Sequence, residues 1–172
     1  MTYMLKRANE HQINFDLSFS GDSKSLILNI ISESDLHTLL ADLTENAIIA
    51  SQNSSKKNIL VQIVFSSDLT SIEILDSGES FAPEVLHNIG RKPVTTHPEE
   101  GSSGIGLMTT FEIALKYKAS FTIDELPDEV SFTKKIAVCF DGLAQYRINT
   151  TLIRKTELLT SLQTKIKSEI II

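Results

Sequence analysis

The stretch NILVQIVFSSDLTSIEILDSG, residues 58–78, decides the fold. Its two runs Asn58–Phe65 and Ser71–Asp76 are rich in β-branched residues, which favour pleated, half-buried strands. The second run ends in Asp76-Ser-Gly78, where an apolar strand gives way to a turn sequence. We therefore expect a sheet at the centre of the molecule, with a polar group at the end of one of its strands.

A long helix is predicted before these strands, over about Leu36–Asn53, with Ser34 or Asp35 as its N-cap. Its apolar residues recur at helical spacing and form one stripe: Leu36, Leu40, Leu43, Ala47 and Ala50. A second face carries Asp42, Asn46, Ile49 and Asn53. The helix thus combines a core face with an organised polar face.

The rest of the chain predicts further strands and helices around a long loop. Residues 1–12 look irregular, and the long segment Ser77–Ser103, helical only near Pro83–Asn88, is typical of a functional lid. Strands are expected at Ile13–Phe19, Leu26–Ile31, Ser120–Asp124, Ser131–Phe140 and Gln145–Ile148, and helices at Gly104–Tyr117 and Lys155–Lys167. Strand and helix do not alternate regularly, which favours an α+β fold with helices on one face of a mixed, mostly antiparallel sheet.

The composition is that of a soluble globular protein. Of 172 residues, 41% are hydrophobic and 22% charged, and the net charge of −6 comes without a basic stripe, which argues against nucleic-acid binding. Cys139 is the only cysteine, which excludes a disulfide framework and favours a reducing, cytoplasmic compartment. No apolar stretch approaches the length of a membrane span, although the chain could be the cytoplasmic end of a membrane-anchored sensor.

Two short segments offer oxygen atoms for ligand binding. Asp42 and Asn46 lie four residues apart on a helix, so both side chains point the same way and could bind Mg²⁺ together with phosphate oxygens. The alternative is a solvated helix face. Asp76, at the mouth of an apolar strand, could accept a hydrogen bond from the exocyclic amine of adenine, and Gly78 would let the backbone approach the ring. The alternative is an ordinary Asp-x-Gly turn.

A third segment, Gly101-Ser-Ser-Gly104-Ile105-Gly106-Leu107, opens a helix. Backbone N–H groups and the helix dipole make such a helix start a phosphate site, although a lid hinge would also need glycines. The segment is neither a dinucleotide-binding fingerprint nor a P-loop, because no strand directly precedes it and no Gly-Lys-Ser/Thr follows.

Together and in this order, the three segments resemble the nucleotide site shared by gyrases, ninety-kilodalton heat-shock chaperones, histidine kinases and mismatch-repair ATPases. Over about residues 35–135 the sequence looks most like the ATP-binding catalytic domain of bacterial sensor histidine kinases. The resemblance implies a Bergerat-type two-layer α/β sandwich with a long ATP lid. It also implies three divisions: a lead-in at 1–12 that is the remnant of a linker, the ATP-binding domain at 13–139, and a C-terminal extension of strand and helix at 140–172.

The resemblance also implies roles for particular residues, with ATP and Mg²⁺ as cofactors. Asn46 would hold Mg²⁺, with Asp42 beside it as the second catalytic residue, and Asp76 would read the adenine amine while Gly78 passes under the base. The expected nucleotide contacts on the lid, the helix start and a late strand are Arg91, Lys92, Gly101, Gly104, Ile105, Gly106, Leu107 and, by a loose match, Thr133. The adenine slot would be lined by apolar residues such as Ile74, Phe81 and Ile105, which could equally be core.

The sequence departs from the family pattern at three positions. Ser80 and Ser102 stand where the glycine boxes often have glycine, which affects lid geometry more than nucleotide identity. Asp42 stands where histidine kinases commonly have asparagine and the hydrolysing relatives have a water-activating glutamate. We therefore expect slow ATP hydrolysis supported by Asp42.

The implied function is that of a histidine protein kinase catalytic domain in a two-component system. It would donate the γ-phosphate to a histidine on a separate dimerisation domain and, through it, to a response regulator. No segment before residue 13 is long enough for that domain, and the C-terminal tail makes a homodimer possible. Two alternatives stay open: a nucleotide-gated binding module, or a serine kinase of the anti-sigma-factor type that regulates a protein partner.

Overall fold

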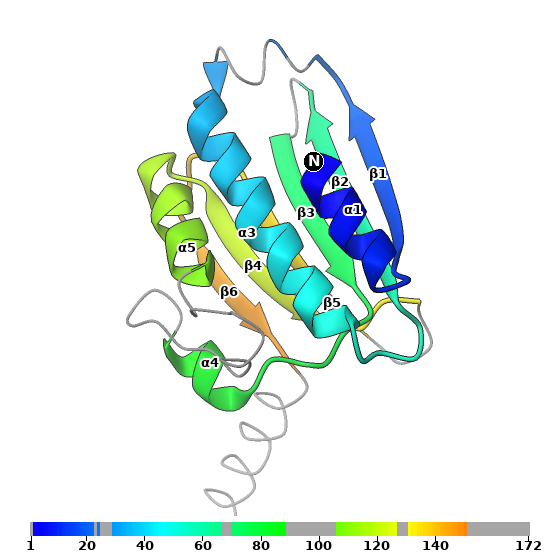
Figure 1. Ribbon diagram of the computed structural model, residues 1–172. Helices are drawn as coiled ribbons and strands as arrows, with labels where there is room; N and C mark the ends of the chain where they lie inside the picture. The colour runs from blue at the N-terminus through cyan, green and yellow to red at the C-terminus, as the bar shows by residue number, and fades with distance from the viewer. Residues whose placement is uncertain are drawn as a thin grey trace, which may run out of the picture.

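The computed structural model describes residues 2–22, 24, 29–66, 70–88, 106–126 and 131–150. Four helices and six strands lie in these ranges (Figure 1). In chain order they are α1 (Thr2–Glu10), β1 (Asn14–Ser20), α3 (Glu33–Ser51), β2 (Asn58–Phe65), β3 (Thr70–Asp76), α4 (Pro83–Asn88), α5 (Gly106–Lys116), β4 (Ser120–Glu125), β5 (Lys134–Cys139) and β6 (Tyr146–Asn149).

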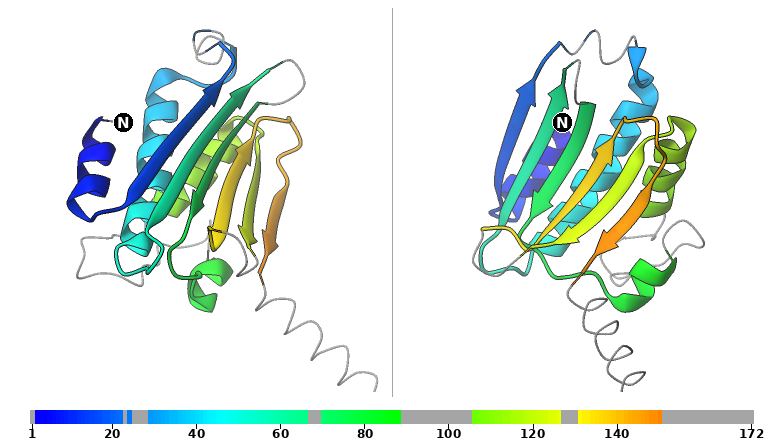
Figure 2. Two further views of the ribbon diagram at one scale, coloured as in Figure 1. Left: turned by 90° about the vertical axis from the view of Figure 1, so that its right-hand side faces the viewer. Right: turned by 180° about the vertical axis from the view of Figure 1, so that it is seen from behind.

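The strands form one mixed sheet in the order β1-β2-β3-β5-β4-β6. The β1–β2 and β4–β6 pairs are parallel, whereas the β2–β3, β3–β5 and β4–β5 pairs are antiparallel. Helices α1, α3 and α5 lie against one face of the sheet, and Figure 2 shows the other face uncovered by these helices. The expected fold class, a two-layer sandwich on a mostly antiparallel sheet, is confirmed.

The core lies between the sheet and the helices. Alternate residues of β2 and β3, including Val61 and Ile72, point to the helices and are buried completely. From the helix side, Leu39, Leu43 and Ile48 of α3 are equally buried. Because buried apolar area is the main stabilising contribution in a domain of this size, α3 and the central strands hold the fold together.

Helix α3 begins earlier than the sequence predicts. Its N-cap is Ser32, whose Oγ accepts a hydrogen bond from the backbone N–H of Asp35 at 3.2 Å, so the proposed caps Ser34 and Asp35 already lie inside the first turn. A serine three residues before an acidic residue is a recognised helix start, and the helix begins there and not at Ser34 or Asp35. The buried face also extends to Thr44, Ile48 and Ser51.

The segment expected to be irregular, residues 1–12, is mostly helical. Helix α1 buries Ala8 and ion-pairs Arg7 with Glu45 of α3. The side chains of His11 and Gln52 contact each other at 3.1 Å just beyond the helix. Tertiary contacts with α3 thus stabilise a nine-residue helix that is too short to be stable alone.

The expected strand Leu26–Ile31 is wrong where the structure describes it. Asn29 is helical and Ile30 lies in a turn, while residues 26–28 fall outside the described part of the chain. The lid after residue 88 and the helix Lys155–Lys167 also lie outside it.

β6, placed by the sequence in a C-terminal extension, is the last strand of the same sheet. None of the described helices is long and apolar enough to cross a membrane.

Two glycines set how closely other segments approach α3. A Cβ on Gly78 would lie 2.4 Å from the backbone carbon of Ala50, so only glycine fits where the chain leaves β3 and passes the last turn of α3. The contact also lets the Glu79 N–H donate a hydrogen bond to the Ala50 carbonyl at 3.3 Å. Gly106, the first residue of α5, is less tight, because its Cβ would meet Asn46 and Asp42 at 3.4 Å or more.

We expect Gly78→Ala to lower the free energy of unfolding by about 1–3 kcal/mol, because backbone atoms must move to admit the methyl group. Gly106→Ala serves as the matched control and should change stability by less than about 1 kcal/mol. Urea denaturation of both variants measures the difference. Equal midpoints for the two variants would contradict the packing described for Gly78.

A polar cluster joins the first turn of α3 to the end of α5. Asp35 Oδ2 accepts hydrogen bonds from Ser32 Oγ at 2.8 Å, Lys116 Nζ at 2.6 Å and Tyr117 Oη at 2.5 Å. The bond from Lys116, followed by those from Tyr117 and Ser32, lowers the pKa of Asp35 to about 2. The ionised carboxylate therefore joins the start of α3 to the end of α5.

The lowered pKa gives this cluster a defined pH dependence. A carboxylate with a depressed folded-state pKa stabilises the fold above its ordinary value of 3.8, and this contribution is lost as the pH falls through about 2. We expect Asp35→Asn to lower the Tm by the same amount at pH 6 and pH 8, and the gap from wild type to close as the pH falls from 4 toward 2. A gap that stays constant down to pH 2 would show that the charge of Asp35 does not act in the cluster.

Candidate functional site

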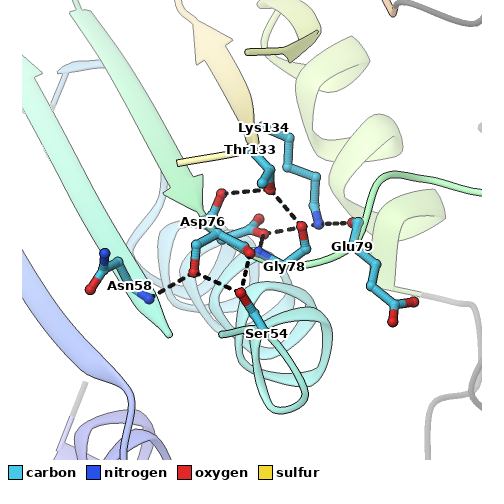
Figure 3. Close-up of polar contacts among 8 residues, drawn as sticks. Ser54, Asn58, Asp76, Gly78, Glu79, Thr133 and Lys134 are labelled. Carbon is cyan, nitrogen blue, oxygen red and sulfur yellow. Dashed lines mark hydrogen bonds and ion pairs between the residues drawn. The ribbon is translucent and has the colours of Figure 1, made fainter. Parts of the chain in front are cut away.

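The C-terminal end of β3 places a carboxylate inside the protein. Asp76 is only 1% exposed, yet it lies at the point where the strand leaves the sheet. Its Oδ1 accepts a hydrogen bond from the Gly78 N–H at 2.8 Å and lies 2.9 Å from Lys134 Nζ (Figure 3). Burial raises the pKa of Asp76, and the Lys134 ammonium and the Gly78 N–H act in the opposite direction.

The turn after Asp76 is fixed by its neighbours on both sides. Ser77 exchanges two backbone-directed hydrogen bonds with Asn58: its N–H donates to the Asn58 carbonyl at 3.0 Å, and its Oγ accepts from the Asn58 N–H at 2.8 Å. Ser54 Oγ donates to the Ser77 carbonyl at 2.6 Å. These bonds hold Gly78 against the last turn of α3, so the turn fixes the end of β3 relative to this helix.

The start of α5 lies beside the polar face of α3. The Gly106 Cα is close enough that an added Cβ would be 3.4 Å from Asn46 Nδ2 and 3.5 Å from Asp42 Cβ. The same helix α3 meets Gly78 at Ala50, one turn after Asn46. The structure therefore brings the turn after Asp76 and Gly106, in the described end of the third segment, against two consecutive turns of the helix that carries Asp42 and Asn46.

Asn46 and Asp42 are the polar groups of α3 that lie beside the start of α5. Asn46 Nδ2 is buried and has no hydrogen-bond partner among the described residues. Asp42 is half-buried, and burial raises the pKa of its carboxyl. Buried amides in folded proteins nearly always have a partner, so this amide, with none among the described residues, requires an explanation, and a ligand beside the start of α5 would provide one.

The beginning of β5 completes the surroundings of Asp76. Thr133 Oγ1 donates to the carbonyls of Asp76 and Gly78, at 3.1 and 2.5 Å, and the Thr133 N–H donates to the Asp76 carbonyl at 2.8 Å. The loose match of Thr133 to this site is thus supported by direct contact. Lys134 was missed by the sequence analysis, although it alternates with the buried residues Ile136 and Val138 on the core-facing side of β5. A lysine at such a position requires a buried partner, which is the signal that could have identified it.

The other predicted residues divide into those that the structure describes and those that it does not. Leu107 and Phe81 are partly buried and pack against the core, and Ile74, with 1% exposure, is a core residue. Arg91, Lys92, Gly101, Gly104 and Ile105 lie outside the described residues. Cys139 is half-buried, and burial together with the nearby Glu73 and Asp141 raises the pKa of its thiol, which disfavours the reactive thiolate.

The site has few oxygen atoms that could bind a metal ion, which suits Mg²⁺ held jointly by the protein and by phosphate groups. Among the described residues, no cluster of three or more histidine, cysteine, aspartate or glutamate side chains could hold a metal ion. Asp42 and Asn46 offer only one carboxylate and one amide oxygen. Mg²⁺ commonly binds in this way, with few protein ligands and with phosphate oxygens and waters completing its shell, so the residues present fit a magnesium–nucleotide complex.

Comparison with solved structures shows the same fold in histidine kinases. Full-length ShkA, solved in complex with AMPPNP, matches 80% of this chain with a TM-score of 0.58 and 17% identity, the match covering 27% of that chain. The catalytic domain of histidine kinase ThkA, in a nucleotide-free form, matches with a TM-score of 0.60 and 14% identity over 80% of this chain and 84% of the other. The mycobacterial sensor histidine kinase MprB gives a TM-score of 0.55 and 18% identity over 80% of this chain and 90% of that chain.

The chain is also similar in sequence to characterised kinases. Sporulation kinase A of Bacillus subtilis is 29% identical over 136 residues, which is 75% of this chain but 21% of that protein. Histidine protein kinase SaeS of Staphylococcus epidermidis is 25% identical over 121 residues, 63% of this chain and 34% of that protein. This chain thus spans between a fifth and a third of the length of these relatives.

A family model matches residues 31–140, the range that holds Asn46, Asp76, Gly78, Gly106 and Thr133. The match covers well over half of the chain and includes every described element from α3 to β5. The chain therefore belongs to the family of histidine kinase-, DNA gyrase B- and HSP90-like ATPases, with its similar sequences and structures among the histidine kinases.

Proposed function

We propose that this chain binds Mg²⁺-ATP on the polar face of α3 and donates the γ-phosphate to a histidine of a separate dimerisation domain. One observation carries the proposal: the turn after β3 and the start of α5 both meet α3 within two turns, around Asn46. A ligand that touches all three segments would therefore lie along these two turns of α3. The membership of the chain in an ATPase family supports ATP as that ligand.

In this proposal Asp76 recognises the base. Its carboxylate, buried at the end of β3, would accept a hydrogen bond from the adenine amine, and Gly78 would hold the following turn close to α3, beside the base. A hydrogen bond to a buried carboxylate is worth about 1.5–3 kcal/mol, because no water competes for it. The ring of Phe81, partly buried and packed on the core, would supply apolar surface nearby.

The phosphates would bind at the start of α5. The backbone N–H groups of the first turn and the positive dipole end of this eleven-residue helix would favour an anion beside Gly106. When bound, Mg²⁺ would supply charge neutralisation on the phosphates, held by the amide oxygen of Asn46 with Asp42 close by. We extend the proposal to Leu107 and Thr133 as neighbours of the nucleotide, and to Arg91, Lys92, Gly101, Gly104 and Ile105 on the lid side.

The proposed reaction is phosphoryl transfer. An imidazole nitrogen of the partner domain attacks the γ-phosphorus, and ADP leaves. Such transfer needs mainly alignment and charge stabilisation, both of which a preformed site can give without a covalent bond to this chain. Sporulation kinase A and SaeS are named as kinases and extend well beyond the length of this chain, which supports a separate partner domain. We propose further that a response regulator receives the phosphate and that the reaction takes place in the cytoplasm.

Nucleotide titration tests the binding site. We expect wild type to bind ATP more tightly with Mg²⁺ than with EDTA, Asp76→Asn to weaken binding by about 10- to 100-fold under both conditions, and Asn46→Ala to remove most of the Mg²⁺ effect. Asp16→Asn, an exposed residue on the edge strand β1, is the matched control and should bind like wild type. Transfer of labelled phosphate to a supplied histidine-containing dimerisation domain then tests the kinase reaction. Wild-type affinity in Asp76→Asn would refute the assigned base contact.

Asp42 gives the site a candidate general base for slow hydrolysis. Burial raises the pKa of its carboxyl, which makes it a better proton acceptor than an exposed aspartate. We expect the rate of ATP hydrolysis to fall as the pH drops through this raised pKa, and Asp42→Asn to abolish the pH dependence and lower the rate by about 100-fold while ATP still binds. Phosphate release measured from pH 4.5 to 8 checks this. Unchanged hydrolysis in the variant would exclude Asp42 as the base.

A further inference from the structure

Lys134 is a buried cation that the proposed function does not use. It is the first residue of β5, lies directly opposite Asp76 in the sheet register, and is 2% exposed. Its Nζ lies 2.9 Å from Asp76 Oδ1, donates a hydrogen bond to the Glu79 carbonyl, and sits 5.2 Å from the centre of the Phe81 ring. A buried ammonium is costly unless it is paired, so these contacts fix both Lys134 and the groups that it touches.

The contacts on Asp76 fall on one side of its carboxylate. Lys134 Nζ and the Gly78 N–H both bind Oδ1, so Oδ2 carries neither of these bonds, as Figure 3 shows. A carboxylate with two open oxygens can receive two parallel hydrogen bonds from a pair of adjacent donors. Within the described part of the chain, Oδ1 of Asp76 is thus engaged twice, which leaves Oδ2 as the acceptor for a ligand.

We propose that Lys134 sets the base selectivity of the nucleotide site by engaging Asp76 Oδ1, so that the carboxylate accepts one donor and not two. The inference rests on the proposed function and adds the residue, Lys134, that would select adenine over guanine. Adenine presents a single donor, its amine, on the edge concerned. Guanine presents N1–H and the 2-amino group side by side, and these two donors match a carboxylate with both oxygens open.

The same contact determines the charge of Asp76. Burial raises the pKa of this carboxyl, and Lys134 is the strongest of the groups that lower it. Without the ammonium, the pKa would rise further, and the ionised, two-acceptor form would be reached only at higher pH. Loss of Lys134 therefore predicts a pH-dependent gain of guanine binding, which loss of packing alone would not produce.

The test measures the affinities of wild type and Lys134→Met for ATP, GTP and ITP from pH 6 to 8.5. In wild type we expect ATP to bind best, with ratios that do not change with pH, and GTP to bind no more tightly than ITP, which lacks the 2-amino group. In Lys134→Met the ATP-to-GTP ratio should fall about tenfold or more at pH 8.5, with GTP now ahead of ITP. Lys134→Arg, which keeps a positive charge beside Asp76, should keep ATP ahead of GTP at every pH.

The controls separate this inference from the function on which it rests. Lys135→Met removes the neighbouring lysine, which contacts Glu73 and Asp124 on the opposite face of β5, and should leave all three affinities unchanged. Tighter binding of GTP than of ITP by wild type would overturn the inference even if Lys134→Met did not fold. A folded Lys134→Met with wild-type ratios would also overturn it. Wild type that binds none of the three nucleotides would instead overturn the proposed function.

Discussion

The site is organised by the burial of one carboxylate. Asp76 ends the central strand β3 with 1% of its surface exposed, and such a group is tolerated only when other groups compensate its charge. The compensation comes from two directions: the Gly78 N–H from the following turn and the Lys134 ammonium from the adjacent strand β5. Satisfying Asp76 therefore fixes the path of the chain after β3 and the start of β5 together.

That path leads directly onto α3. Because Gly78 has no side chain, the turn packs on the backbone of Ala50, and the Glu79 N–H bonds to the Ala50 carbonyl. One and two turns earlier on α3, Asn46 and Asp42 lie beside the start of α5. The same α3–α5 pair is tied at its far end by Asp35, Lys116 and Tyr117. A single helix thus sets the distance between the part of the site suited to a base and the part suited to phosphates.

Most of this arrangement could be predicted from sequence because it depends on local patterns. The β-branched runs of β2 and β3 and the long amphipathic helix are encoded within short windows, and the order of Asn46, Asp76 and Gly106 identified the family. Helix α1 was missed because it depends on contacts such as Arg7–Glu45 that join distant segments. The cap Ser32 was missed because Ser34 and Asp35, which can also cap a helix, follow it closely. The position of Lys134 among buried residues signals that it needs a partner, but which partner it has is visible only once β5 is placed next to β3.

The most direct test of the central claim is a crystal structure of this chain with Mg²⁺ and a non-hydrolysable ATP analogue. Our account predicts the adenine amine within hydrogen-bonding distance of Asp76 Oδ2, the phosphates against the N–H groups at the start of α5, and Mg²⁺ bound to the Asn46 amide oxygen. A nucleotide bound elsewhere, or bound with its base away from Asp76, would contradict the account.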